Sequence, residues 1–94
     1  MEKWVIITYD IRDKRRLART ARCLSSYGIR LQRSIFLVHA EDDIIDKIEY
    51  RLQRIISYED SVLFLPICEH DKKKVLAFGV NITENYMDKP YLIF

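Results

Sequence analysis

A lone acidic residue, Asp10, follows the apolar run at residues 4–9 (WVIITY) and precedes a dense group of basic residues. A carboxylate in this position can hold a hard cation such as Mg²⁺ or Mn²⁺, or it can cap the helix that follows. Asp13 is better placed as the cap, because it stands directly before KRRLAR. One carboxylate is a poor metal site. We therefore expect a metal at Asp10 only if a two-fold axis brings a second Asp10 close, or if phosphate oxygens complete the coordination.

Basic residues are concentrated in one part of the chain. Residues 11–33 hold eight basic residues and one acid, so this segment carries +7 although the whole chain carries only +2. On a helix, the apolar positions Leu17, Ala21 and Leu24 would face the core. The opposite side would carry one stripe of arginines, formed by Arg15, Arg16, Arg19 and Arg22. Such a stripe is either an ordinary solvated face or a surface for phosphates, and the absence of acids within it favours phosphates. The predicted nucleic-acid-binding residues are Arg12, Arg15, Arg16, Arg19, Arg22 and Arg33.

Other reactive side chains give weaker signals. The Tyr9 hydroxyl could orient a phosphate or a water beside Asp10, and we include it as a catalytic candidate, although an aromatic in a central strand is more often core. His39 and His70 have no cysteine or histidine at zinc-ligand spacing. Cys23 and Cys68 are expected to be free thiols, which suits a reducing cytoplasm. No apolar run approaches the ~20 residues that cross a bilayer, so we expect no membrane contact.

The elements that must position these residues follow from hydrophobic periodicity. Residues 4–9 predict a central strand and residues 13–27 a helix, with Gly28 as its left-handed cap. Residues 29–39 predict a second strand with a bulge or break at 32–34. Residues 41–56 predict a second helix, whose apolar face consists of Ile44, Ile48, Leu52 and Ile55. The remaining predictions are an edge strand at 61–68 containing Pro66, a polar loop at 69–74 and a short strand at 75–80.

This order predicts an α+β fold, a ferredoxin-like sandwich in which two helices cover one face of an antiparallel sheet. Because 4–9 and 61–68 carry apolar side chains on both faces, we expect a second subunit to cover the open face, giving a homodimer with facing sheets. Residues 1–80 would form the single domain and 81–94 a C-terminal extension. Its last residues should pair with the other subunit or a partner; they are Tyr91, Leu92, Ile93 and Phe94.

Three segments in this order resemble the CRISPR-associated Cas2 family, the small subunit of the spacer-acquisition machinery. They are YDI at 9–11 before the basic helix, YGIRLQRSIF at 27–36 and DSVLFLPIC at 60–68. The resemblance spans roughly residues 3–68 and implies a ferredoxin-like homodimer with the two copies of Asp10 near its axis. It also implies that Gln32, Ser34 and Phe36 shape the bulged strand and the dimer.

The resemblance implies two activities, and the fold a third. The first is a scaffold that binds double-stranded DNA and bridges dimers of the Cas1 integrase, with Asp10 dispensable. The second is a Mg²⁺-dependent endonuclease acting on RNA or DNA, with Asp10 of each subunit holding one metal. The third is a toxin-like ribonuclease of the same fold outside CRISPR. The first two are compatible with each other.

Overall fold

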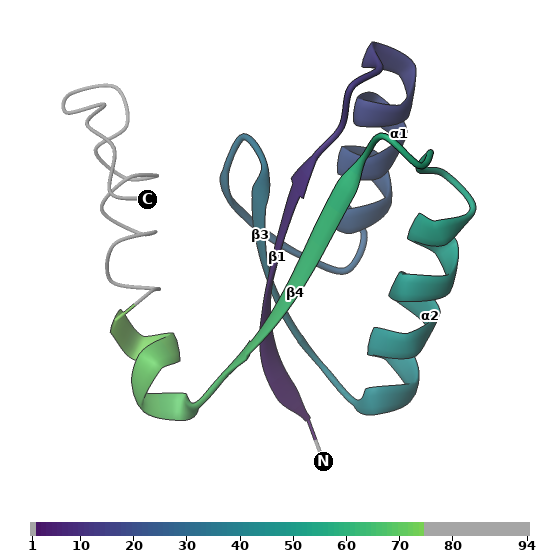
Figure 1. Ribbon diagram of the computed structural model, residues 1–94. Helices are drawn as coiled ribbons and strands as arrows, with labels where there is room; N and C mark the ends of the chain where they lie inside the picture. The colour runs from purple at the N-terminus through teal and green to yellow at the C-terminus, as the bar shows by residue number, and fades with distance from the viewer. Residues whose placement is uncertain (1, 75–94) are drawn as a thin grey trace, which may run out of the picture.

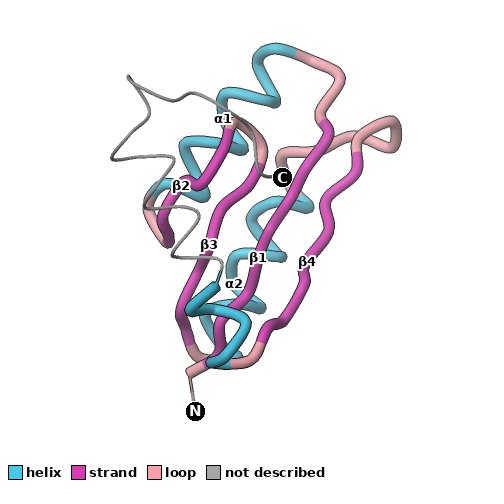
Figure 2. Tube along the Cα trace, turned by 90° about the vertical axis from the view of Figure 1, so that its left-hand side faces the viewer, coloured by secondary structure: helices cyan, strands magenta, loops and turns pink. Residues whose placement is uncertain are grey.

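The computed structural model describes residues 2–74, which form an antiparallel sheet with the helices over residues 14–25 and 42–53 packed on one of its faces (Figure 1). The elements in chain order are β1 (Lys3–Asp10), α1 (Lys14–Ser25), β2 (Gly28–Gln32), β3 (Ile35–Ala40), α2 (Asp42–Gln53) and β4 (Ser61–Ile67). Within the sheet the strands lie in the order β2-β3-β1-β4, as the tube view shows (Figure 2). The predicted α+β architecture is therefore confirmed. The strand expected at 75–80 and the extension at 81–94 lie outside the described residues.

Strand β1 occupies the middle of the sheet, as its apolar sequence predicted, with β3 on one side and β4 on the other. Its side chains alternate between the two faces. Val5, Ile7 and Tyr9 face the helices and are buried, whereas Trp4, Ile6 and Thr8 are half-buried on the opposite face. We call the face away from α1 and α2 the open face. Pro66 lies in β4 at the edge of the described sheet. Because β4 has a neighbouring strand on one side only, the missing N–H of proline costs no hydrogen bond to a second described strand.

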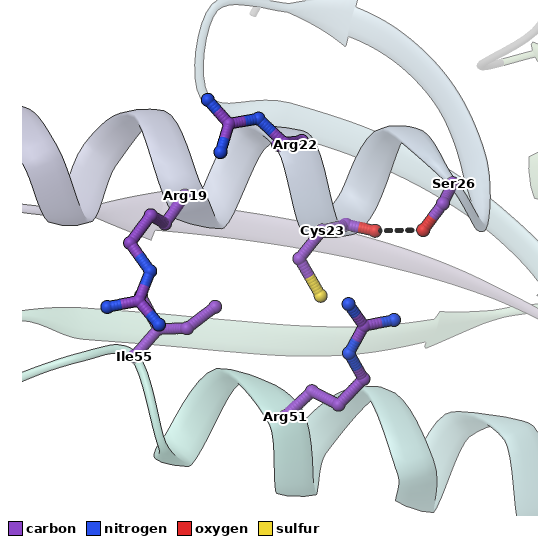
Figure 3. A pocket seen from close by; sticks show the side chains of 6 residues that line it. All are labelled: Arg19, Arg22, Cys23, Ser26, Arg51 and Ile55. Atoms are coloured by element: carbon purple, nitrogen blue, oxygen red, sulfur yellow. Dashed lines mark hydrogen bonds between the residues drawn. The ribbon is translucent and has the colours of Figure 1, made fainter.

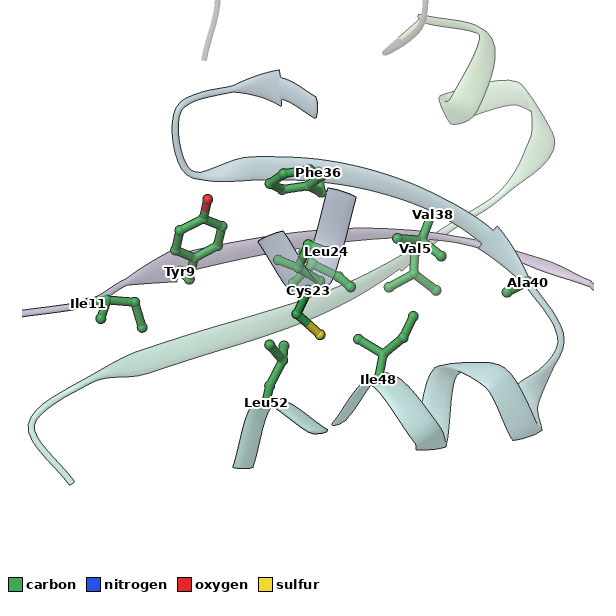
Figure 4. Close-up of a cluster of buried hydrophobic side chains, with 11 residues drawn as sticks. Val5, Tyr9, Ile11, Cys23, Leu24, Phe36, Val38, Ala40, Ile48 and Leu52 are labelled. Carbon is green, nitrogen blue, oxygen red and sulfur yellow. The ribbon is translucent and has the colours of Figure 1, made fainter. Parts of the chain in front are cut away.

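The two helices lie side by side across the sheet, with Cys23 of α1 opposite Arg51 of α2 (Figure 3). Between them and the sheet is one cluster of buried apolar side chains (Figure 4). Leu24 from α1, Ile48 and Leu52 from α2, and Phe36 from β3 are almost completely buried there. The periodicity that predicted helix 41–56 identified Ile48 and Leu52 correctly as core positions.

The end of α1 differs from the prediction. Asp13 is the N-cap, as expected, and its Oδ2 accepts a hydrogen bond from the Arg16 backbone N–H at 2.9 Å. The helix ends at Ser25 with a right-handed cap at Ser26, and no described glycine has a positive φ. Gly28 instead opens β2, where an added Cβ would collide with the Leu37 carbonyl oxygen on β3. Close strand approach, and not a left-handed turn, requires this glycine.

The orientation of α1 also differs from the prediction. Thr20, Cys23 and Leu24 face the core, whereas Leu17, expected there, is 37% exposed. The Arg16 side chain is turned inward and is only 24% exposed. The arginine stripe therefore lies beside the buried face of the helix and not opposite it.

One connection agrees with the sequence prediction and another differs from it. The break considered at 32–34 is real, because β2 and β3 are separate strands whose register shifts between Arg30 and Gln32. Residues 69–74, expected as a loop, are helical. This turn is held against the start of β1, since the Trp4 indole donates to Glu69 Oε1 at 2.9 Å and Lys72 Nζ lies 4.8 Å from the centre of the Trp4 ring. No helix among the described residues is long and apolar enough to span a membrane.

Candidate nucleic-acid interface

The predicted metal ligand, Asp10, is the last residue of β1 and lies opposite Ser61 of β4. By the alternation of the strand it lies on the open face, and its side chain is 64% exposed. Arg12 Nη2 lies 3.4 Å from Asp10 Oδ2. Since Asp13 provides the cap of α1, Asp10 is not needed for that role. The carboxylate is therefore accessible to a ligand from solvent or from another subunit.

A single chain does not complete a metal site at Asp10. Within residues 2–74 there is no group of three or more histidine, cysteine, aspartate or glutamate side chains that could hold an ion. The carboxylate oxygens of Asp10 suit a hard cation such as Mg²⁺, but further oxygen ligands would have to come from outside the described residues, and a second copy, water or phosphate could supply them. The expectation that Asp10 holds a metal together with a second copy of itself or with phosphate therefore stays a prediction.

Tyr9, predicted as the catalytic companion of Asp10, points to the opposite face of the sheet. It is 6% exposed, and its hydroxyl donates to the Arg33 carbonyl oxygen at 2.9 Å. Burial raises the pKa of Tyr9, and the nearby charge of Arg30 partly offsets this rise. The structure therefore does not bring the two predicted catalytic side chains together, and the contacts of Tyr9 are those of a residue that ties β1 to the β2–β3 turn.

A residue that the sequence reasoning missed, Asp60, organises this corner. Its side chain has no exposed surface and accepts hydrogen bonds from Arg16 Nε at 2.7 Å and Arg16 Nη2 at 3.2 Å. It also accepts from the backbone N–H groups of Arg12 at 2.9 Å and Ser57 at 2.8 Å. The hydrogen bonds from Arg16 hold the pKa of the Asp60 carboxyl well below its usual range.

Arg16 is consequently committed to an ion pair. Its Nη2 also lies 3.0 Å from Glu59 Oε1, and its pKa is raised by the hydrogen bond to Asp60. The prediction that Arg16 points outward with the other arginines is wrong. The available signal was Asp60 itself, an acid directly before an apolar strand in a chain whose basic helix lacks acids of its own.

The other predicted arginines are solvent-exposed. The side chains of Arg15, Arg19 and Arg22 form no hydrogen bond or ion pair with any residue in 2–74, and we call these three the arginine face. Arg12 is 64% exposed beside Asp10. Arg33 is exposed in the β2–β3 turn, which lies at the same end of the sheet as Asp10 because Ile35 pairs with Thr8. The predicted phosphate contacts thus fall into an arginine face on α1 and two further arginines near Asp10.

The remaining predicted residues lie in or beyond the strands. Phe36 is fully buried in the core. The Ser34 carbonyl oxygen accepts from the Tyr9 backbone N–H at 3.2 Å, and Gln32 follows the register shift with its Nε2 buried. The expected partner contacts at 91–94 lie outside the described residues. Cys23 is a buried free thiol and Cys68 an exposed one.

Comparisons with known proteins agree on one family. The family model described as CRISPR associated protein Cas2 matches residues 1–75. The chain is 36% identical over 75 residues to an endoribonuclease Cas2 of Synechocystis sp., covering 79% of this chain and 82% of the relative. It is 35% identical over 82 residues to that of Geobacter sulfurreducens, with 84% and 86% coverage.

A solved structure is also similar. The crystal structure of Streptococcus pyogenes Cas2 superposes with a TM-score of 0.70 at 27% identity, and the match covers 76% of this chain and 93% of that one. The likeness therefore extends across the described fold.

Proposed function

Because this chain belongs to the CRISPR-associated Cas2 family, we propose that it acts as a homodimer that binds double-stranded DNA in spacer acquisition and bridges Cas1 integrase dimers. The observation that carries the proposal is the arginine face, Arg15, Arg19 and Arg22, exposed and without an acidic partner in residues 2–74. Since an acid within reach would neutralise these charges, their isolation leaves them available for phosphates.

The open face supports the dimer. Ile6, Leu63 and Leu65 share this face by register, and Leu63 and Leu65 are 54% and 42% exposed. Removing adjacent rows of apolar side chains from water stabilises the association of the two surfaces that cover them. Packing two open faces together would cover these rows and would place both Asp10 carboxylates in the same interface.

The test of DNA binding is charge reversal on the arginine face. The double variant Arg15→Glu/Arg19→Glu should lower the affinity for a DNA duplex at least about tenfold and flatten the dependence of log K on log salt by about 2. The matched control, Lys47→Glu/Arg54→Glu, makes the same charge change on exposed positions of α2. Arg16 is avoided because its reversal would place a second negative charge beside the buried Asp60.

Two results would contradict the proposal. If both double variants lost affinity equally, net charge and not the arginine face would control binding. Unchanged affinity in the Arg15/Arg19 variant would show that duplex DNA uses another surface.

A second candidate function is metal-dependent cleavage of phosphodiester bonds. The exposed Asp10 carboxylate on the open face favours it, and both relatives named above are called endoribonucleases. A Mg²⁺ or Mn²⁺ ion held by Asp10 of two subunits would supply a water activated for attack on phosphorus. Incubation of the purified protein with single-stranded RNA or duplex DNA, with Mg²⁺ or with EDTA, tests this directly. Cleavage that persists in EDTA would contradict a metal mechanism.

The toxin-like ribonuclease differs from both in its cellular setting. A neighbouring integrase gene and a repeat array would favour the adaptation role, whereas an isolated gene would favour the toxin. Co-purification with the Cas1 integrase tests the bridging role on the protein itself, and failure to bind it would contradict that role.

A further inference from the structure

A pocket of about 320 Å³ lies between α1 and α2, on the side of the sheet away from the open face, and Figure 3 shows the side chains that line it. Its lining residues are Arg19, Arg22, Cys23, Ser26, Arg51 and Ile55. The volume lies near the lower end of the range for ligand sites and exceeds the need of one phosphate group. Two members of the arginine face therefore meet a third arginine, from the other helix, around one cavity.

The charge around this pocket is unbalanced. Three guanidinium groups line it and no carboxylate does. Arg19 and Arg22 have no ion pair within residues 2–74, and the described contacts of Arg51 are with the neutral Tyr27. Arg22 and Arg51 lie in the last turns of their helices, where positive charge also suits the helix dipole, yet neither side chain donates a hydrogen bond to a helix carbonyl within residues 2–74. The donors of Arg22, and those of Arg51 that do not contact Tyr27, remain free for an anion.

Arg51 is held in place for such a ligand. Its Nη1 donates to the Tyr27 hydroxyl at 2.9 Å, and its guanidinium carbon lies 5.5 Å from the centre of the Tyr27 ring. A guanidinium has five N–H donors, so one hydrogen bond to Tyr27 fixes the side chain and leaves four for a ligand. A planar, oriented fork of donors matches phosphate oxygens better than a flexible ammonium does.

The floor of the pocket adds no competing negative charge. The Cys23 side chain points toward Arg51 (Figure 3), and burial raises the pKa of its thiol, which keeps it neutral. The Ser26 hydroxyl donates to the Cys23 carbonyl oxygen at 2.7 Å, so its proton is already used. Recognition of an anion would therefore depend on the three arginines.

We propose that this pocket binds one backbone phosphate of the nucleic-acid strand that runs along the arginine face, with Arg51 supplying the contact from α2. The inference rests on the proposed DNA-binding function and adds a residue that lies outside the basic segment 11–33. A phosphate between the helices would neutralise the mutual repulsion of the three guanidinium groups, which is the source of its affinity.

The chain offers a closely matched control for Arg51. Arg54 is exposed on the same helix and makes the same kind of contact, with its Nη1 3.3 Å from the Tyr50 hydroxyl and its guanidinium carbon 5.8 Å from that ring. Arg54 does not line the pocket. Arg51→Gln and Arg54→Gln therefore remove equal charge and one tyrosine contact each, and only Arg51→Gln changes the lining of the pocket.

The test measures duplex DNA affinity of the full chain over a range of salt. Arg51→Gln should weaken binding about tenfold at low salt and reduce the salt slope by about 1, the loss of one phosphate contact, whereas Arg54→Gln should stay within about twofold of the parent. Arg51→Lys keeps the charge but not the planar set of donors, so its affinity for duplex DNA should lie between those of the two glutamine variants. If Arg51→Gln does not fold, Arg51→Lys replaces it in the test. Equal affinities for the Arg51 and Arg54 variants would overturn the inference.

Titration with inorganic phosphate separates a strand phosphate from a free one. Amide NMR signals of Cys23 and Ser26 should shift in the parent and in Arg54→Gln but not in Arg51→Gln. If those shifts depend on Arg51 while duplex affinity does not, the pocket holds free phosphate and the inference is wrong. If the parent protein binds no duplex at any salt, the proposed function itself fails, and the parent alone shows it.

Discussion

Two aspartates at one end of the sheet have opposite environments. Asp10 ends β1, and Asp60 immediately precedes Ser61, the residue of β4 that pairs with Asp10. The Asp10 side chain is 64% exposed beside Arg12, at 3.4 Å. The Asp60 side chain has no exposed surface and accepts four hydrogen bonds, from Arg16 Nε, Arg16 Nη2, and the backbone N–H groups of Arg12 and Ser57.

This difference in burial gives the two carboxylates different roles, one in stabilising the fold and one in binding a ligand. A buried carboxylate is tolerated when every oxygen has a donor, so Asp60 ties α1 and the segment before β4 together and has no capacity left for a ligand. An exposed carboxylate with one distant partner adds little to folding and keeps its oxygens available. Of the two acids, Asp10 is therefore the one suited to metal or phosphate chemistry, and Asp60 the one that fixes the frame around it.

The largest expected effect is on cleavage. If the chain has Mg²⁺-dependent nuclease activity, Asp10→Ala should reduce its rate at least about a hundredfold, because it removes the exposed carboxylate oxygens that would hold the ion. A fluorescent RNA or duplex cleavage assay measures this. Asp46→Ala, an exposed aspartate on α2, is the control and should retain full activity. Equal loss in both variants would remove Asp10 from the catalytic role.

The next effect is on stability. Asp60→Ala should lower the melting temperature by roughly 15 °C, because it leaves Arg16 without its buried partner and two backbone N–H groups without an acceptor. Asp10→Ala should change it by less than about 2 °C. Differential scanning calorimetry compares the two. If both variants had the same melting temperature, the distinction between a structural carboxylate and one available to a ligand would not hold.

The contribution of Asp60 should also depend on pH. Its pKa is lowered in the folded protein, so the ionised form favours folding at any pH above the unfolded value of about 3.9 and this gain is lost as pH falls toward the folded value. The melting temperatures of the parent and Asp60→Asn should therefore differ most near neutral pH and converge as pH falls below about 4. A constant difference from pH 7 to pH 2.5 would show that ionisation of Asp60 is not the source of the stability.

Adjacent arginines on α1 provide a smaller test. Arg16→Lys keeps the charge but cannot reproduce the paired Nε and Nη2 hydrogen bonds to Asp60, and should lower the melting temperature by roughly 8 °C. Arg15→Lys, at an exposed position without a described partner, should have no measurable effect on melting. Equal behaviour of the two variants would contradict the inward orientation of Arg16.

A third aspartate in the same corner should have the smallest effect. Asp13→Ala removes the N-cap hydrogen bond to the Arg16 backbone and should cost about 1 kcal/mol of unfolding free energy, measured by urea denaturation. Asp13→Ser, which can cap equally well, should restore most of it. A failure of serine to do so would mean that the negative charge of Asp13, and not its hydrogen bond, stabilises the helix.

The features predicted correctly depend on local sequence. The central strand with Asp10 at its end, the cap at Asp13 and the core positions Ile48 and Leu52 follow from periodicity within a few residues. The features predicted wrongly depend on distant contacts. Arg16 turns inward to meet Asp60, 44 positions away, and residues 69–74 become helical against Trp4, 65 positions before Glu69. The hydrophobic periodicity within α1 or within 69–74 cannot predict these contacts, because the partners Asp60 and Trp4 lie in other parts of the sequence.

The sequence by itself determined which residues alternate, where α1 and α2 begin and where positive charge is concentrated, because these follow from backbone geometry and nearest-neighbour chemistry. Only the tertiary structure decided which charges remain available. It buries Asp60 with Arg16, leaves Asp10 and the arginine face exposed, and brings Arg51 across to Arg19 and Arg22. The physical reason is that pairing of a charge depends on the distance between side chains in space, which the packing of helices on the sheet sets.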